Sequence, residues 1–458
     1  MKNLTLKNIA EAVHGTLYLN GGNENTEIAG AVTDNRQVEK DYLFIPIKGA
    51  KVDGHDFIES AFEKGAAVVF SQKEEVTKTG PYILVESSEQ ALKDLAAFYR
   101  QQLSIPVIGV IGSVGKTSTK EMLASVLEEK YSVLKTEGNF NNEIGMPLTL
   151  LKIRDHHEVA VVEMGISDFD EMHRLGKVAT PDIVVMTNIK ECHLENLGDR
   201  DGVLKAKTEV FEHLAKNASV VLNGNDDKLS TVKEVPGAKV YFAGVRDSSF
   251  SVYADEIKAE GMNGSFAHFH TPEGDFYAEV PLPGEHHVSN ATLACRVGLI
   301  LGLTLQEIKA GIESAKSIAG RNNFLKLSQD VTVIDDCYNA NPASMKASLS
   351  VLSKCGGRSI AVLGDMGELG KDERNLHFEV GQAVKDEKIS MLFAVGALSE
   401  EIAKGARGGE TEVFWFATKE EMLPCLKEKI KKGDTVLVKA SHFMEFPKVV
   451  EALVSLFS

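Results

Sequence analysis

The sequence predicts an α/β fold that is divided into three domains. Short apolar runs of strand length alternate with helical patterns along most of the chain, as in proteins whose parallel strands are joined by helices. A length of 458 residues is more than one hydrophobic core usually holds. In the middle of the chain, the glycine-rich stretch "GVIGSVGKTSTKEML" begins at Gly109, directly after an apolar run, and continues into a helical pattern. We therefore place the three domains at residues 1–103, 104–316 and 317–458.

The first segment mixes short strands with helices and predicts a small α/β N-terminal domain. The strand candidates are "YLFIPI", "AAVVFS" and "YILVE". The helix candidates are "DFIESAFEKG" and "SEQALKDLAAFYRQQL", the second of which leads into the middle segment.

The middle segment predicts a parallel sheet. Buried strands are expected at "IPVIGVIG", "EVAVVEMG", "PDIVVMTNI", "ASVVLNG" and "AKVYFAG". Continuous apolar runs of this kind are typical of parallel strands that are covered on both faces. The stretch 251–282 alternates in character and predicts added antiparallel strands. Two helices follow, and a capping box from Thr304 to Glu307 opens the second.

The third segment alternates cleanly between strands and helices and predicts a Rossmann-like domain. Its strands are expected at "VTVIDDCY", "SIAVLGDM", "SMLFAVG", "EVFWFA" and "TVLVKAS". This segment has no glycine-rich phosphate loop of its own. A central domain flanked by two smaller α/β domains is typical of an enzyme that closes a cleft over several substrates.

The glycine-rich stretch of the middle segment predicts a nucleotide site, or P-loop, at the end of the first strand. Glycines let the backbone approach an anion, and the amides that open the following helix point at phosphate oxygens. Lys116 supplies a charge for the outer phosphates, and the hydroxyl of Thr117 is a candidate Mg²⁺ ligand. Val110 stands where the usual spacing has its first glycine. The candidate contacts are Gly112, Ser113, Gly115, Lys116, Thr117 and Ser118. The loop indicates ATP or GTP and leaves the reaction open.

Charge and cysteine content restrict the partners and the compartment. The net charge of −16 opposes binding to nucleic acid and to anionic membranes. Five cysteines at scattered positions favour a reducing compartment. The chain lacks an apolar run near the ~18 residues of a membrane span. We expect a cytoplasmic monomer that neither binds nucleic acid nor inserts into membranes.

Polar residues at strand ends are further candidates, because open α/β sheets place their sites there. Glu163 ends the strand "VVE", and His193 follows the next strand in "TNIKECH". Together they could hold a divalent metal beside the phosphate loop. The alternatives are a capped strand-end carboxylate for Glu163 and a histidine without a ligand role for His193. Lys207 lies in the helical stretch "VLKAKTEVF", where a solvated surface lysine is the default interpretation.

Asparagines and one arginine mark two more candidate loops. The stretch "EGNFNNE" carries Asn139, Asn141 and Asn142, which either meet a ligand or simply form a turn.

In "DDCYNANP" of the third segment, Asp336 could take a pair of ribose hydroxyls. Asn339 and Asn341 could instead cap the helix that Pro342 opens. Arg321 lies at the boundary between the second and third segments, where it either reaches a phosphate or bridges the two domains.

Taken together, these motifs resemble the Mur ligase family over essentially the whole chain. The resemblance rests on "GSVGKTSTKEML", "TEGNFNNEIGMPLTLL", "VVEMGIS", "TNIKECHLENLG", "LPGEHHVSNATLA", "DDCYNANPASMKASL" and "VLGDMGELG". "YNANP" with "LGDMGELG" indicates the dipeptide-adding member, and "TDNR" with "LFIPIKGAKVDGHDF" is similar to the family's uridine-nucleotide module. The resemblance implies an ATP-dependent amide ligase that joins D-alanyl-D-alanine to UDP-N-acetylmuramoyl-tripeptide through an acyl phosphate, in peptidoglycan precursor synthesis. A folate polyglutamylating ligase and a nucleotide-dependent switch are the alternatives.

The resemblance also implies roles for individual residues. It implies that Lys116 and Thr117 hold the ATP phosphates and metal, and that Glu163 and His193 are Mg²⁺ ligands. It implies that Lys207 is carbamylated and positions a second Mg²⁺. Asn290 is expected at the adenine, Asp336 at the ribose and Arg321 at the γ-phosphate. The implied substrate contacts are Asn35, Arg36, Lys48, Gly49, Asp53, His55, Asn139, Asn141, Asn142, Tyr338, Asn339 and Asn341.

A few positions depart from the family pattern. Lys190 stands where glycine is usual, His287 where asparagine is usual, and His442 lies in "KASHFM", which replaces a usual lysine-glycine-serine-arginine run. These departures leave the substrate-side contacts open, whereas the nucleotide and metal candidates all remain.

Overall fold

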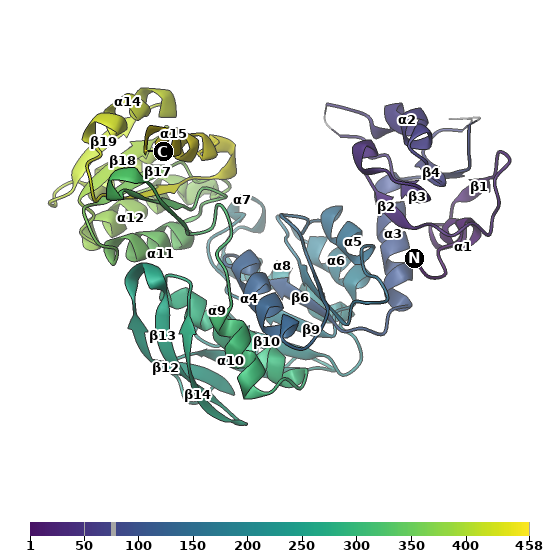
Figure 1. Ribbon diagram of the computed structural model, residues 1–458, viewed down its shortest axis with the longest axis horizontal. Helices are drawn as coiled ribbons and strands as arrows, with labels where there is room; N and C mark the ends of the chain where they lie inside the picture. Colours follow the sequence, from purple (N-terminus) through teal and green to yellow (C-terminus); the bar gives the residue numbers. More distant parts are fainter. Residues whose placement is uncertain (50, 75–78, 458) are drawn as a thin grey trace.

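The computed structural model describes residues 1–49, 51–74 and 79–457. Three sheets divide these residues into three α/β domains that follow one another along the chain, and the predicted fold class is confirmed. The central domain lies between the other two, with the N-terminal domain on one side and the C-terminal domain on the other (Figure 1). Each sheet is built from strands of one predicted segment, while the residues chosen as boundaries stay predictions.

The N-terminal domain is a five-stranded sheet in the order β1-β5-β4-β3-β2. Only β1 runs antiparallel to its neighbour β5; the other pairs are parallel. The elements are α1 (Leu6–Ala12), β1 (Thr16–Tyr18), β2 (Gly30–Val32), η1 (Asn35–Gln37), β3 (Tyr42–Phe44), η2 (Gly54–Phe57), α2 (Ile58–Glu63), β4 (Val68–Ser71), β5 (Tyr82–Leu84) and α3 (Ser88–Gln101). Arg100 at the end of α3 donates to the backbone of Ala179 and Thr180 and to the Asp182 carboxylate, which ties this domain to the central one.

The central domain is a nine-stranded sheet in the order β14-β13-β12-β11-β10-β9-β6-β8-β7. Strands β6 to β12 pair in parallel, and β12, β13 and β14 form the antiparallel extension that the alternating stretch predicts. The strands are β6 (Val107–Ile111), β7 (Val133–Lys135), β8 (Val159–Glu163), β9 (Ile183–Met186), β10 (Ser219–Asn223), β11 (Lys239–Val245), β12 (Val252–Ala259), β13 (Ser265–Thr271) and β14 (Gly274–Val280).

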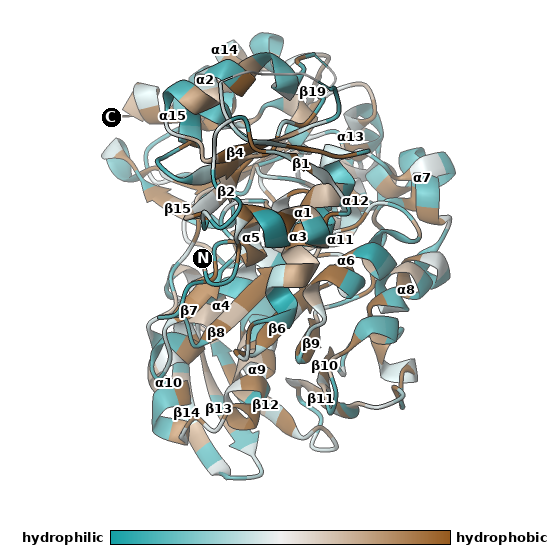
Figure 2. Ribbon diagram, turned by 90° about the vertical axis from the view of Figure 1, so that its right-hand side faces the viewer, coloured by the Kyte–Doolittle hydropathy of each residue, from teal (hydrophilic) through white to brown (hydrophobic). Residues whose placement is uncertain are grey.

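Helices cover both faces of this sheet, which explains the continuous apolar runs of its strands. Residues of β6, β8 and β9 alternate between two hydrophobic cores, one on each face. Figure 2 shows the central strands as mostly hydrophobic and the helices around them as mixed. The helices are α4 (Lys116–Glu128), α5 (Gly145–Leu150), α6 (Glu171–Ala179), α7 (Leu194–Leu197), α8 (Arg200–Thr208), η3 (Glu209–His213), η4 (Leu229–Thr231), η5 (Gly261–Asn263), α9 (Glu285–Ile300) and α10 (Leu305–Glu313). The predicted capping box of Thr304 and Glu307 opens α10.

The C-terminal domain is a six-stranded sheet in the order β15-β16-β20-β17-β18-β19, parallel except for the first pair. Its strands are β15 (Asn323–Lys326), β16 (Thr332–Asp335), β17 (Ser359–Gly364), β18 (Met391–Val395), β19 (Glu412–Phe416) and β20 (Thr435–Lys439). Its helices are η6 (Ser328–Asp330), α11 (Pro342–Ser353), η7 (Gly370–Asp372), α12 (Glu373–Asp386), α13 (Ser399–Ala406), α14 (Lys419–Lys429), η8 (His442–Met444) and α15 (Pro447–Phe457). None of the helices in the described ranges combines the length and the apolar character that a membrane span needs.

Candidate active site

A cavity of about 910 Å³ opens where the central and C-terminal domains meet. The phosphate loop, the ends of β8 and β9, and α9 line it from the central domain. The C-terminal domain contributes the loop after β16, the start of α11, the loop after β17 and the end of β20. The cavity therefore lies at the carboxyl ends of parallel strands from two sheets, where α/β proteins bind their ligands.

The phosphate loop adopts the conformation that its glycines predict. A Cβ atom on Gly112 would lie 1.9 Å from Oγ1 of Thr187, so only glycine lets the loop pass so close to the end of β9. Gly115 has φ +82° and directly precedes α4, a conformation that glycine adopts without strain. The Lys116 ammonium lies over the loop and donates to the Gly112 carbonyl at 2.9 Å. The backbone amides at the start of α4 thus face the cavity, as phosphate binding requires.

Thr117, Glu163 and Asn141 form a chain of polar contacts next to the phosphate loop. Glu163 is only 2% exposed; its carboxylate accepts from the Thr117 hydroxyl at 2.9 Å and from the Asn141 amide at 2.7 Å. Among the described residues, no lysine, arginine or histidine forms an ion pair with it. A buried carboxylate that lacks a cationic side-chain partner and lies beside a hydroxyl is suited to hold Mg²⁺, which prefers oxygen ligands. The predicted metal candidates Thr117 and Glu163 are therefore adjacent.

His193 lines the same cavity and contacts the C-terminal domain. It precedes α7 with φ +51°, and its Nδ1 lies 2.6 Å from a carboxylate oxygen of Glu368. This contact with the His193 ring lowers the pKa of the Glu368 carboxyl. Engagement of Nδ1 by a carboxylate directs Nε2 to a metal, which is the usual arrangement around metal-bound histidines. Sequence reasoning missed Glu368, although it stands in the motif "LGDMGELG".

Lys207 is buried, so its interpretation as a solvated surface lysine is wrong. Its side chain on α8 is 1% exposed. Burial lowers its pKa to about 8; the nearby charge of Lys116 acts in the same direction, whereas Cys192 and Glu171 oppose the shift. Lys116, Cys192 and Glu171 all line the cavity, so Lys207 lies just behind the cavity wall. A primary amine in this environment is partly neutral near physiological pH.

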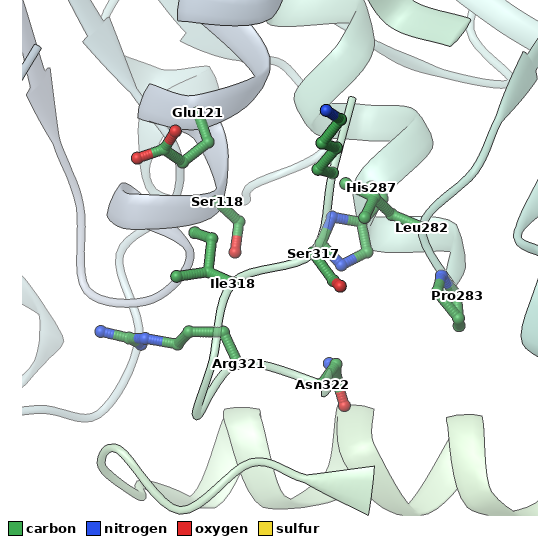
Figure 3. A pocket seen from close by; sticks show the side chains of 10 residues that line it. Ser118, Glu121, Leu282, Pro283, His287, Ser317, Ile318, Arg321 and Asn322 are labelled. Carbon is green, nitrogen blue, oxygen red and sulfur yellow. The ribbon is translucent and has the colours of Figure 1, made fainter. Parts of the chain in front are cut away.

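Arg321 connects the linker between α10 and β15 to the phosphate loop. Its Nη2 lies 3.3 Å from the Thr117 hydroxyl, and its guanidinium stacks on the Tyr338 ring at 3.9 Å from the ring centre. Figure 3 shows this junction, with Ser118 and Glu121 on α4 and the linker residues Ser317, Ile318, Arg321 and Asn322 beside them. Arg321 thus bridges the two domains and also reaches the phosphate site. The two roles that the sequence offered as alternatives therefore belong to the same side chain. Tyr338, predicted as a substrate contact, supports Arg321 from the C-terminal side.

Asn290 and Asp336 occupy different environments within the cavity wall. The Nδ2 atom of Asn290 is buried without a hydrogen-bond partner among the described residues, which suits an amide that donates to a ligand base. Asp336 is already bonded: one oxygen accepts from the Asn322 amide, and the other accepts from Ser348 at 2.5 Å and Lys439 at 2.6 Å. Lys439 at the end of β20 escaped sequence reasoning, because its partner lies 103 residues away.

Most of the predicted asparagines form hydrogen bonds with the backbone of nearby turns and helix starts. Asn341 caps α11 and shares a capping box with Ser344, as the structural alternative predicts. Asn142 accepts from the amides of Ile144 and Gly145 at the start of α5. Asn341 and Asn142 both still line the cavity, as Asn141 and Asn339 do. Asn139 lies close enough to Tyr338 to influence its pKa, which burial raises overall.

The predicted contacts of the N-terminal domain lie apart from this cavity. Asn35 and Arg36 form η1, where Arg36 is highly exposed and pairs with Asp34. His55 is buried: Asp53 contacts its Nδ1 at 2.7 Å, and the Gln72 amide donates to its Nε2 at 3.2 Å. Lys48 pairs with Asp53 across a short β-bridge, and Gly49 belongs to the same turn. Among the described residues, these side chains lie at two turns of the N-terminal domain. Their role in binding one end of a long substrate stays a prediction.

Comparisons with known proteins agree with this architecture. Residues 27–106 match the family model "Mur ligase family, catalytic domain", residues 110–298 match "Mur ligase middle domain", and residues 320–442 match "Mur ligase, glutamate ligase domain". A UDP-N-acetylmuramoyl-tripeptide–D-alanyl-D-alanine ligase of Bacillus subtilis is 37% identical over 456 residues, which is 98% of this chain and 98% of the relative. This chain belongs to the Mur ligase family.

Solved structures of this Mur ligase type have the same fold. The structure of MurF from Acinetobacter baumannii superposes with a TM-score of 0.91 at 31% identity and covers 98% of both chains. MurF ligase from Thermotoga maritima, solved in complex with ADP, gives a TM-score of 0.81 at 31% identity over 93% of this chain and 97% of that one. The family predicted from the motifs is thereby confirmed.

Proposed function

We propose that this Mur ligase joins D-alanyl-D-alanine to UDP-N-acetylmuramoyl-tripeptide, with cleavage of ATP to ADP and phosphate, in peptidoglycan precursor synthesis. One observation carries the proposal: the phosphate loop and the "YNANP" loop line the same cavity. Full-length relatives that bear this name support it. The first loop serves the nucleotide, and the second is the motif that indicates a dipeptide donor.

The reaction requires activation of a carboxylate, because an amine does not displace hydroxide from it in water. The terminal carboxylate oxygen of the tripeptide attacks the γ-phosphorus of ATP, and ADP leaves. The amine of D-alanyl-D-alanine then attacks the acyl carbon, loses a proton, and inorganic phosphate leaves as the amide forms. None of these steps needs a covalent bond to the protein, so positioning and charge neutralisation supply the catalysis.

The cavity residues account for the charge neutralisation. Lys116 and Arg321 approach the phosphate site from two sides and stabilise charge on the transferred phosphoryl group. Thr117 and Glu163 are placed to hold Mg²⁺, which neutralises phosphate charge when bound. His193 would complete that ligand set, with Glu368 orienting its ring. The site lies between two domains, so closure of the C-terminal domain over it would protect the acyl phosphate from water.

Lys207 is proposed to carry a carbamate. Its neutral amine adds to CO₂, a C–N bond forms, and one proton is released. The low pKa supports this step, because about a tenth of the amine is neutral at pH 7 when the pKa is about 8. The resulting carboxylate would face the positive charge of Lys116 and would help to position a second Mg²⁺. Within this proposal, the N-terminal domain binds the uridine nucleotide, and the protein acts in the cytoplasm.

A product assay with a panel of amino donors tests the function. The enzyme receives ATP, Mg²⁺ and UDP-N-acetylmuramoyl-tripeptide together with D-alanyl-D-alanine, glutamate, lysine or diaminopimelate. We expect phosphate release and a product larger by one dipeptide, seen by mass spectrometry, with D-alanyl-D-alanine only. The matched control is Lys116→Ala, which keeps the fold and removes the phosphate-site charge. A product carrying a single added amino acid would assign the chain to a different Mur ligase type.

A further inference from the structure

The antiparallel extension of the central sheet has one apolar face and one face rich in metal-binding side chains. Ala254, Ala267, Phe269 and Ala278 point into the core beneath α9 and α10. On the opposite face, the register places Asp255 of β12 next to His268 of β13, and His270 of β13 next to Asp275 of β14. The extension lies at the end of the central sheet away from the N-terminal domain (Figure 1). The proposed ligase function gives this face no role.

Three ligand atoms converge on this face. Oδ1 of Asp255 lies 2.9 Å from Nε2 of His270 and 3.7 Å from Nδ1 of His268, and the three residues each offer one ligand atom within 4.8 Å of the others. Ligands around a tetrahedral Zn²⁺ ion with bonds of about 2.0–2.1 Å lie about 3.3 Å apart. The observed distances bracket this value, so small side-chain rotations suffice to bind an ion.

Stacking interactions hold both rings in place. His268 stacks on Tyr277 at 4.1 Å between ring centres, and His270 stacks on Tyr253 at 4.3 Å. Both histidine side chains are less than one-fifth exposed, at 17% and 19%. A β-bulge follows Asp255 directly and bends the strand at that point. The ligand set is therefore pre-organised by its surroundings, which lowers the entropic cost of binding.

A fourth residue, Asp275, contacts one of the three ligands, as outer carboxylates usually do in metal sites. Nδ1 of His270 lies 3.2 Å from a carboxylate oxygen of Asp275. This contact orients the His270 ring, as outer carboxylates do in zinc proteins. Asp275 therefore acts on the site through the orientation of His270.

We propose that Asp255, His268 and His270 bind a divalent transition-metal ion of the Zn²⁺ class, with Asp275 as the positioning residue for His270. Two imidazoles and one carboxylate suit Zn²⁺ or Co²⁺ and do not suit Mg²⁺, which takes oxygen ligands. Bound metal would join β12 to β13 directly and β14 through Asp275. Its role is to stabilise the extension.

A second cluster on the central domain is the natural comparison. His173, Glu212 and His213 also converge, with His173 Nδ1 2.8 Å from Glu212 and 3.1 Å from His213 Nε2. The Glu212 side chain is 62% exposed, and in the described residues no carboxylate orients the other nitrogen of either ring. This cluster contains the same types of ligand but lacks an outer carboxylate that orients the rings. A variant in it therefore serves as a matched control.

Metal binding to the full-length protein tests the proposal. The protein is stripped with a chelator and kept in excess Mg²⁺ so that oxygen-rich sites are occupied. Zn²⁺ affinity is then measured by competition with a chromogenic chelator, and the visible spectrum of bound Co²⁺ reports the ligand geometry. The variants are His270→Gln, Asp255→Asn and Asp275→Asn, with His173→Gln as the control. Circular dichroism and ligase activity confirm that each variant is folded.

We expect one equivalent of Zn²⁺ on the wild type and on His173→Gln, and a rise in the melting temperature of both. His270→Gln and Asp255→Asn should weaken binding at least 100-fold, and Asp275→Asn by about 10- to 100-fold. Asp255→Asn leaves every ring in place, so it tests the site even where loss of a histidine unfolds the extension. Wild-type protein without stoichiometric Zn²⁺ overturns the proposal, as does binding that His173→Gln abolishes or that Asp255→Asn leaves unchanged.

Discussion

Replacement of Lys207 by methionine should make the protein more stable and nearly inactive. Methionine fills a similar volume without a charge, so it removes the buried ammonium and leaves the packing largely intact. The same change removes the amine that the proposed carbamate needs. A gain in stability together with a loss of activity is the expected behaviour of a residue kept for function.

The size of the stability gain follows from the pKa. Burial lowers the pKa of Lys207 from 10.5 to about 8, and each pKa unit is worth about 1.4 kcal/mol, so the charged form costs about 3 kcal/mol in the folded state. Because the pKa is depressed, the cost is fully present below pH 8 and is relieved as the pH rises from about 8 towards 10.5. The wild type should therefore gain unfolding free energy across this window, and Lys207→Met should lack that part of the pH dependence.

Urea unfolding in CO₂-free buffer without nucleotide measures both effects, at pH 7 and at several values up to pH 10. Lys205→Met is the matched control, because Lys205 lies on the same helix and is exposed. We expect Lys207→Met to gain up to about 3 kcal/mol at pH 7 and the control to change by about 0.5 kcal/mol or less. A less stable Lys207→Met with the wild-type pH slope would refute the argument that burial depresses this pKa.

Three further outcomes follow from the cavity. Lys116→Ala should lower turnover by several orders of magnitude, because the lost ammonium stabilises negative charge on the transferred phosphoryl group. Turnover within tenfold of wild type would exclude this loop from the chemistry. Arg321→Lys keeps the positive charge but loses the planar stacking on Tyr338, so kcat should fall clearly in steady-state assays. An unchanged kcat would show that Arg321 only connects the two domains. Glu368→Gln should raise the Mg²⁺ concentration for half-maximal activity about 10- to 100-fold, whereas an unchanged value would show that Glu368 does not orient His193.

The regular elements of the fold were predictable wherever their signal is local. The buried parallel strands carry continuous apolar runs, and the capping box at Thr304 requires only four consecutive residues. The short strands β1, β2 and β15 escaped prediction. Each has only three or four residues of mostly partial or no burial, too few to establish a period.

Residues of the candidate site were likewise predictable only where their signal is local. The phosphate loop was predictable because strand, glycines, lysine and helix follow one another within about a dozen residues. Lys207 was ambiguous, because a helical lysine has the same local sequence whether it is buried or solvated. Glu368 and Lys439 were missed because their partners, His193 and Asp336, belong to distant parts of the chain.

By itself, the sequence determined the α/β class, the phosphate loop, the strand ends that carry polar groups, and the family. Each depends on residues that are neighbours along the chain, where periodicity and turn chemistry act directly. Only the tertiary structure decided that Arg321 reaches Thr117, that Lys207 is buried, and that His268, His270 and Asp255 share one face. The contacts of Arg321 and of the histidine face join elements that are separate in sequence. Burial, which sets the pKa of Lys207, depends on how whole domains pack around a residue, and that packing has no local signature.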